Sequence, residues 1–263
     1  MRVALCISGQ MRSFEECYPS QYQNLIEIFQ PDVFIHTWSD LGQSIREKVA
    51  SDVITPESLD NKLSKLYAPK RMVIEDYHAS YCDLFHGVKV PEVLKEAEPV
   101  SYKGALPMFY KIWACNQLCL EYALEVGIKY DLVIRLRPDL YIDEPLSEFK
   151  RLVGRENELL LGHLTDVFAS DRIAAGSPEA MSYYCCVWER LEQYWQNPLQ
   201  DGNKNNHLVG ERLMRWHLRW SKLEYRSMRA LTHIKRYDES ISAIRKKLFK
   251  KKVKRFFREL VGA

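Results

Sequence analysis

The sequence lacks the long apolar run of a transmembrane segment, and the apolar run that follows Arg2 is too short for a signal peptide. It also lacks a glycine-rich P-loop ending in Lys and Ser or Thr, which counts against a kinase-like phosphotransferase. Its seven cysteines are an odd number, without the two spaced pairs and histidines that a zinc site needs. We therefore expect reduced thiols and a cytoplasmic protein.

Charge is unevenly distributed along the 263 residues. The net charge is +3, but residues 244–263 hold nine Lys or Arg and one acid, so the remainder has a net charge of −5. A mildly acidic body does not suggest nucleic acid as a partner. With 46% hydrophobic and 28% charged residues, the chain has the composition of one large α/β domain, with or without an appendage.

The stretch 130–143 is the most informative part of the sequence. It begins with a short apolar run rich in β-branched residues, which predicts a buried strand of a parallel sheet. Arg135 and Arg137 then lie on one face, because alternate residues of a strand share a face. A proline ends the regular pairing, and Asp139 follows it directly. Since ligands of open α/β sheets bind at the carboxyl ends of strands, we expect a ligand site here.

The chemistry of this cluster suits a nucleoside diphosphate. Arginine side chains match phosphate oxygens, and a carboxylate can share a Mg²⁺ or Mn²⁺ ion with the same phosphates. The alternative is a structural ion network at a strand end, in which Arg135, Arg137 and Asp139 satisfy one another.

Two further strand ends supply candidate binding residues. The turn after a first strand at 2–7 contains Gly9, Gln10 and Arg12, which are predicted to border the nucleotide. A second strand at 32–37 brings His36 and Trp38 to its end, where the indole can stack on a base or sugar and the imidazole can bind a phosphate or hydroxyl. The alternatives are an ordinary strand–helix turn with a solvated arginine, and a His and a Trp that serve only packing.

Three segments together resemble a known family. They are Ser-Gly-Gln-x-Arg at 8–12, Asp-Val-Phe-Ile-His-Thr-Trp at 32–38 and Arg-Leu-Arg-Pro-Asp at 135–139. This pattern resembles GT-A-like glycosyltransferases of bacterial surface-polysaccharide gene clusters, over most of residues 1–180. The resemblance implies an α/β fold with a GT-A-like, Rossmann-type mixed sheet flanked by helices. It also implies a nucleotide-sugar donor and a surface-polysaccharide or lipid-linked glycan acceptor.

The resemblance further implies roles for three acids. Asp139 lies in the segment that carries the DxD-type metal motif, although Arg137 stands where the first Asp would be, so Asp139 alone would hold Mn²⁺ or Mg²⁺. Asp171 would bind the donor sugar or the acceptor, and Glu211, near the start of a late helix, would be the catalytic base. The alternative for Glu211 is a first-turn acid that the helix dipole favours.

Periodicity and turn signals predict the remaining elements. Residues 76–100 lack periodicity and predict an irregular insertion that can cover the site. Ser177-Pro178-Glu179 is a strong helix start, with a cap, a proline and an acid in order. The expected elements are strands at 71–75, 158–162 and 171–176, and helices at 18–29, 56–67, 107–126, 178–195 and from 207 onward.

The tail is predicted to be a separate unit, residues 241–263, after a domain of residues 1–240. Between 244 and 260 its apolar residues are expected on one side of a helix and its cations on the other, as in helices that lie on anionic membranes. This places the protein peripherally at the inner face of the membrane. A solvated tail and a contact with RNA are the alternatives.

Three functions remain open from the sequence. A glycosyltransferase accounts for the arginines and for Asp139. A non-catalytic protein of the same fold, which binds a nucleotide sugar or glycan and assists assembly at the membrane, accounts for the missing first Asp. A sulfotransferase or phosphotransferase accounts for the arginines but less well for Asp139.

Overall fold

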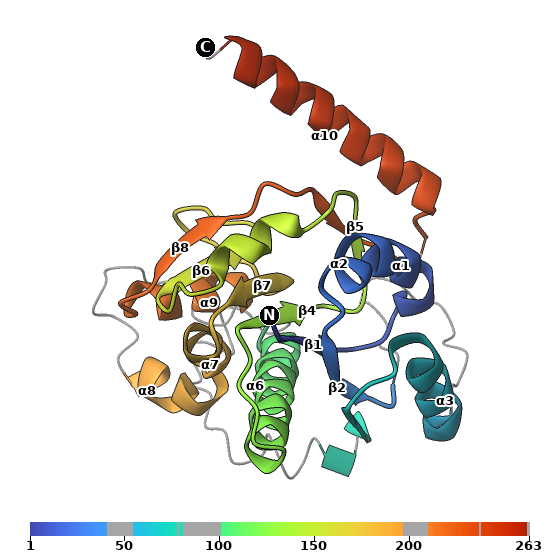
Figure 1. Cartoon of the computed structure of the whole chain (residues 1–263), viewed down its shortest axis with the longest axis vertical. Coiled ribbons are helices and arrows are strands. Elements are labelled where there is room, and N and C mark those ends of the chain that lie inside the picture. The colour runs from blue at the N-terminus through green and yellow to red at the C-terminus, as the bar shows by residue number, and fades with distance from the viewer. Residues whose placement is uncertain (41–54, 78, 81–100, 197–209, 237, 262–263) are drawn as a thin grey trace.

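The computed structural model describes residues 1–40, 55–77, 79–80, 101–196, 210–236 and 238–261. Within these residues, seven strands form one sheet in the order β3-β2-β1-β4-β7-β6-β8, in which β7 is antiparallel to both neighbours and the other strands share one direction (Figure 1). The strands are β1 (Val3–Gly9), β2 (Asp32–Trp38), β3 (Arg71–Glu75), β4 (Leu132–Leu136), β6 (Glu158–Leu161), β7 (Ile173–Gly176) and β8 (Glu224–Ser227).

Helices cover both faces of this sheet, and the strand residues alternate between two cores. Cys6 of β1 belongs to the core on one face, together with Phe109 and Cys115 of the helix at 101–125. Leu5 belongs to the core on the other face, together with Phe14 and with residues of the helix at 56–67. Burial on both faces explains why these strands are continuous apolar runs. The helices are α1 (Phe14–Gln21), α2 (Glu27–Phe29), α3 (Pro56–Tyr67), α6 (Ser101–Glu125), α7 (Pro178–Cys185), α8 (Leu191–Gln196), α9 (Gly210–Arg219) and α10 (Ile241–Val261).

Two helices begin at the predicted type of start signal, a capping hydroxyl followed by proline. The Oγ1 of Thr55 accepts from the backbone N–H of Ser58 at 3.2 Å, and α3 has the predicted bounds. The Oγ of Ser177 accepts from the N–H of Ala180 at 3.1 Å. These caps satisfy N–H groups that the first helical turn leaves without partners.

The predicted fold class is confirmed: the chain forms a mixed sheet flanked by helices, with a helical C-terminus. Several boundaries differ. The helix expected at 107–126 begins at Ser101, and the segment expected at 18–29 begins at Phe14 and contains a π-helical turn at Tyr22–Ile26. The helix expected at 178–195 is broken after Cys185. Most of the predicted insertion at 76–100 lies outside the described residues.

A second, two-stranded sheet was not predicted. It pairs β5 (Leu140–Ile142) antiparallel with β9 (Thr232–Ile234), directly after the segment that carries Arg135 to Asp139. This pairing turns the chain away from the large sheet at Pro138. The last helix, α10, begins beside α1 and β5 (Figure 1), where Ile244 and Leu248 are fully buried. No helix in the described part of the chain is long and apolar enough to cross a membrane.

Candidate functional site

The site lies where the sheet changes its direction of winding. The chain passes from β1 to β2 on one side of β1, and then crosses through α6 to β4 on the other side. The carboxyl ends of β1 and β4 therefore diverge, which is where open α/β sheets bind ligands. A pocket of about 190 Å³ opens at this point. It is lined by Ser8, Gly9, Gln10, Arg12, Trp38, Tyr77, Gly104, Pro107, Met108, Arg135 and Arg137.

The turn after β1 forms one wall of the pocket. Gly9 has a φ of 116°, a conformation that residues with a Cβ rarely adopt, and its carbonyl accepts a hydrogen bond from the Oγ1 of Thr37 at 2.7 Å. Arg12 donates from Nη2 to the Oε1 of Gln10 at 2.7 Å, which directs the guanidinium along the turn. The structure thus brings the three turn residues predicted from the sequence into the pocket.

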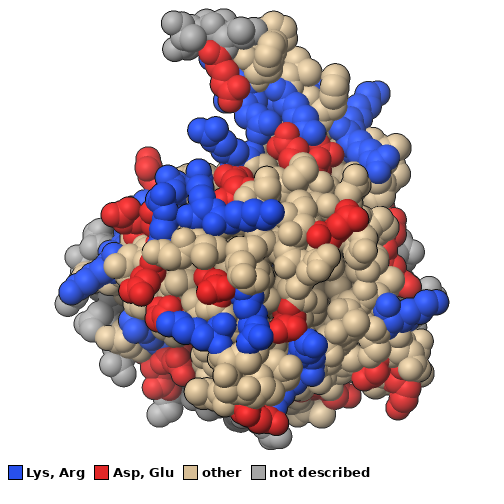
Figure 2. Space-filling view, viewed as in Figure 1, with Lys and Arg blue, Asp and Glu red and all other residues tan. Residues whose placement is uncertain are grey.

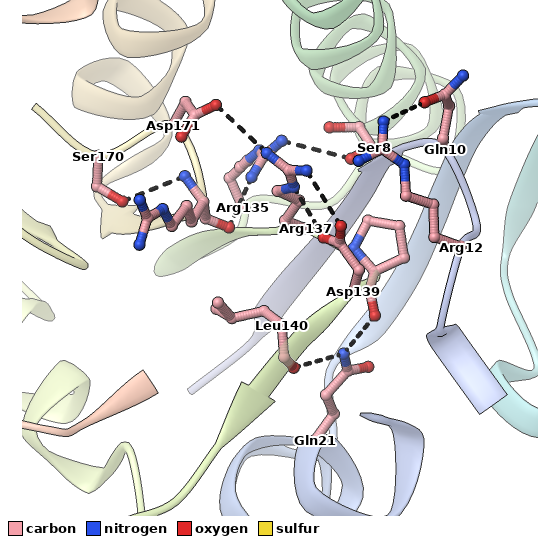
Figure 3. A network of polar contacts seen from close by, with 12 residues as sticks. Ser8, Gln10, Arg12, Gln21, Arg135, Arg137, Asp139, Leu140, Ser170 and Asp171 are labelled. Carbon is pink, nitrogen blue, oxygen red and sulfur yellow. Dashed lines mark hydrogen bonds and ion pairs between the residues drawn. The ribbon is translucent and has the colours of Figure 1, made fainter. Parts of the chain in front are cut away.

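Arg135 is a buried cation at the base of the pocket, with 1% of its surface exposed. It donates from Nη1 to the carbonyl of Arg172 at 2.6 Å and from Nη2 to the carbonyl of Ser8 at 3.3 Å (Figure 3). Among the described residues it has no carboxylate within 4.0 Å, and burial lowers its pKa. Its Nε and the Oγ of Ser8 are buried and have no hydrogen-bond partner in the described structure. Both residues line the pocket, so its wall contains two buried polar atoms without a partner among the described residues.

Arg137, unlike Arg135, has two carboxylate partners. Its Nε and Nη2 donate to the two oxygens of Asp139 at 2.7 and 3.0 Å, and its Nη1 lies 3.6 Å from Asp171 Oδ2 (Figure 3). Burial alone would raise the pKa of Asp139, but the charge of Arg137 and its hydrogen bonds outweigh burial and lower it. Asp139 is 1% exposed and lies behind Arg137.

The arrangement of Asp139 does not fit the predicted metal. Mn²⁺ and Mg²⁺ require several oxygen ligands, and both oxygens of Asp139 already accept from Arg137. Among the residues that the structure describes, no group of three or more His, Cys, Asp or Glu could hold a metal ion. Asp139 is therefore a partner of Arg137 in this structure.

The other two predicted catalytic acids also pair with arginines. Asp171 is 5% exposed and faces Arg137, and its neighbour Arg172 donates from Nη2 to Glu211 Oε1 at 2.9 Å. The backbone carbonyl of Glu211, in the first turn of α9, also accepts from the N–H of Ala169 at 2.9 Å. Arg137 thus joins Asp139 and Asp171, whereas Glu211 pairs separately with Arg172, and none of the three carboxylates lines the pocket.

His36 and Trp38, predicted together, have different positions. Trp38 lines the pocket, whereas His36 is 6% exposed and lies behind the wall. The Nδ1 of His36 is 3.1 Å from the Nζ of Lys111, and burial, followed by the charge of Lys111, lowers the pKa of His36 to about 4. His36 is therefore a neutral hydrogen-bond acceptor for Lys111, and it does not reach the pocket.

Lys111 lies behind the pocket wall and was given no role in the sequence-based prediction of the site. It is fully buried, donates to Glu75 Oε2 at 2.5 Å and to the carbonyl of Thr37 at 2.8 Å, and lies 3.5 Å above the Trp38 ring. Burial lowers its pKa to about 8, although Glu75 opposes this shift. A lone lysine within the apolar stretch of α6 was the available signal. Its contacts fix the indole that forms the pocket wall.

Comparisons with known proteins add little to this geometry. No protein-family model and no curated protein sequence matches the chain. Among solved structures, the chain is similar to mouse xyloside xylosyltransferase 1 in its apo form, with a TM-score of 0.47 and 12% identity over 86% of this chain and 84% of that chain. This likeness is too distant to carry an argument, so the pocket itself must indicate the function.

Proposed function

We propose that the protein is a glycosyltransferase that transfers a sugar from a nucleotide-sugar donor to a surface-polysaccharide or lipid-linked glycan acceptor. The observation that carries this proposal is a pocket at the divergence of β1 and β4 that is lined by Arg12, Arg135 and Arg137. The resemblance of the three sequence segments to GT-A-like glycosyltransferases supports the same reaction.

The charge balance of the pocket suits a diphosphate. Three arginines line it, and the two buried carboxylates nearby, Asp139 and Asp171, both face Arg137. Arg135 has no carboxylate in contact among the described residues, so the pocket retains positive charge. When the bond between the sugar and the diphosphate breaks, negative charge grows on the leaving oxygen, and guanidinium groups already fixed in place stabilise it without rearrangement.

Each predicted acid has a role in this scheme. Asp139 is a positioning residue, because its two hydrogen bonds orient the guanidinium of Arg137. Asp171 would bind a sugar hydroxyl beside that guanidinium. The acceptor hydroxyl attacks the sugar carbon as the diphosphate leaves. Glu211 would take the proton of that hydroxyl once its ion pair with Arg172 has opened.

The second candidate is a non-catalytic protein that binds the same nucleotide sugar. It is favoured by Arg137, which stands where a metal-binding Asp would be and occupies both oxygens of Asp139. Both candidates bind a nucleotide in the pocket, and only the first cleaves the donor.

One pair of measurements separates these possibilities. Calorimetry with UDP, GDP and CMP is expected to show binding that Arg137→Ala weakens by about tenfold or more, since one phosphate–arginine contact contributes 1.5–3 kcal/mol. Arg226→Ala is the matched control and should bind as the wild type. It removes an exposed arginine of β8 that is paired with Glu158 of β6. Binding without turnover of any donor in a broad nucleotide-sugar panel would favour the second candidate, and absence of binding to all three nucleotides would refute both.

We also propose that the protein acts in the cytoplasm. The six cysteines in the described part of the chain are free thiols, and five of them are buried, as expected in a reducing compartment. Glycan synthesis from cytoplasmic nucleotide sugars is consistent with this location.

A further inference from the structure

The C-terminal helix α10 has two apolar faces, where the sequence predicted one. Ile244 and Leu248 are fully buried against Cys17 of α1 and Tyr141 of β5. Another face of the helix carries three exposed aromatic rings. Phe249 is 66% exposed, and Phe256 and Phe257 are each 59% exposed. Residues 244 and 248 are one turn apart, as are 249, 253 and 256, so the two sets follow separate lines along the helix.

The cations of α10 fall into two groups, those that form ion pairs and those that do not. Lys252 pairs with Asp143 at 2.8 Å, Arg255 pairs with Glu144 at 2.9 Å, and Lys247 pairs with Glu239. The hydrogen bond from Lys252 to Asp143 raises the lysine's pKa. These pairs, together with the buried Ile244 and Leu248, hold the helix against the body.

Five other cations of α10 are exposed and have no ion pair among the described residues. At 100° per residue, Lys246, Lys250 and Lys254 lie along one flank of the aromatic face, and the other two lie farther round the helix. Figure 2 shows Lys and Arg side chains gathered along this helix, which extends away from the sheet in Figure 1. The five are Lys246, Lys250, Lys251, Lys254 and Arg258.

We propose that α10 is a preformed docking helix that places Phe249, Phe256 and Phe257 in the interface of an anionic lipid membrane. An anionic bilayer supplies both an apolar boundary for the three rings and negative charge for the five unpaired cations. Because the body already stabilises the helix through Ile244 and Leu248, membrane binding does not have to offset the cost of forming it.

Charge complementarity also orients the molecule. The chain before residue 244 has a net charge of −5, so an anionic surface attracts α10 and repels the body. RNA would satisfy the cations but would leave three neighbouring phenylalanine side chains without an apolar environment, whereas the membrane interface accommodates both groups. This inference does not depend on the proposed transferase activity.

Co-sedimentation of the full chain with vesicles tests the proposal. The protein is expected to bind phosphatidylcholine–phosphatidylglycerol vesicles at least about tenfold more strongly than phosphatidylcholine vesicles, since each cation near an anionic surface contributes on the order of 1 kcal/mol. Added salt should weaken this binding. Equal binding to both vesicle types would overturn the proposal, as would binding to RNA without binding to vesicles.

Two sets of variants separate the rings from the cations. The triple variant Phe249→Ser, Phe256→Ser and Phe257→Ser should bind vesicles at least about tenfold more weakly, because it removes the apolar contacts with the membrane. The triple variant Lys246→Glu, Lys250→Glu and Lys254→Glu should lose at least about as much, because it removes three cations near the anionic surface. The matched controls change exposed residues elsewhere: Leu124, Val153 and Val167 to Ser, and Lys65, Lys150 and Lys222 to Glu.

The controls decide the interpretation. They should sediment as the wild type does, and circular dichroism should show the same melting temperature for all variants, because every substitution lies on an exposed surface. Wild-type binding by the phenylalanine variant, or equal losses in the controls, would show that α10 is not the docking surface.

Discussion

Arginine and lysine have different surroundings in the pocket and on α10, and the difference shows how burial decides what a cation does. In the pocket, carbonyls hold Arg135 and carboxylates hold Arg137, so each guanidinium presents its donors in one fixed direction. On α10, five cations are exposed and unpaired among the described residues. Fixed donors can recognise one ligand geometry, whereas exposed charges add up to an attraction that salt screens.

The largest effect is expected where the loss of a partly buried cation leaves two buried acids behind. Arg137→Met removes the partner of Asp139 and Asp171, so the free energy of unfolding should fall by about 3–5 kcal/mol, as when one member of a buried ion pair is lost. Arg135→Met removes a cation without a carboxylate partner and should cost only about 1–2 kcal/mol for its two hydrogen bonds. Urea denaturation measures both, and equal losses would contradict the difference between the two arginines.

The second effect is a loss of stability in mild acid. Burial lowers the pKa of both His36 and His217 to about 4, with the charge of Lys111 adding to the shift at His36. Below pH 6.5 the unfolded chain binds a proton at each histidine, while the folded chain does not until about pH 4. Stability therefore falls as the pH decreases through this window, by about 2 kcal/mol for each histidine at pH 5.

Urea denaturation at several pH values measures this slope. The double variant His36→Gln and His217→Gln cannot take up these protons, so its stability should change much less between pH 7 and pH 5. An unchanged slope in the variant would show that other groups cause the acid sensitivity.

A smaller effect is expected in the turn that borders the pocket. Gly9→Ala places a Cβ on a residue with a φ of 116°, which should cost about 1–3 kcal/mol of stability. Gly104→Ala is the matched control, because a Cβ there meets no heavy atom within 4 Å and α6 favours alanine. Thermal denaturation compares the two, and equal melting temperatures would show that the turn relaxes around the new side chain.

The smallest effect is expected on α10. Lys246→Ala, Lys250→Ala and Lys254→Ala together should change the free energy of unfolding by less than about 0.5 kcal/mol per substitution, because none of the three has an ion pair in the described structure. A larger loss would mean that these cations stabilise the fold, and the contrast with the pocket would then be wrong.

Local patterns were sufficient to predict most of the fold. The strand at 71–75 and the helix at 56–67 have the predicted bounds, because a short apolar run and a helix of mainly polar residues are local signals. The grouping of Arg135 and Arg137 in one pocket followed from strand alternation. The turn residues Gly9, Gln10 and Arg12 also line this pocket, and their role in binding a nucleotide stays a prediction.

What the sequence could not predict depends on contacts between distant segments. The pairing of β5 with β9 joins two three-residue strands that are far apart in the chain. The side of α10 that is buried depends on Cys17 and Tyr141, so a helical wheel alone could not separate its two apolar faces. Likewise, the position of His36 behind the wall depends on Lys111 of α6. The catalytic roles of Asp171 and Glu211 stay predictions.

The most direct test of the central claim is calorimetry that compares UDP, UMP and uridine in the wild type and in Arg135→Met. If the pocket recognises a diphosphate through its arginines, UDP should bind the wild type most tightly and uridine least. Arg135→Met should remove most of the advantage of UDP over UMP, while a melting curve confirms that the variant is folded. Equal affinity for the three compounds, or an unchanged preference for UDP in the variant, would contradict the account.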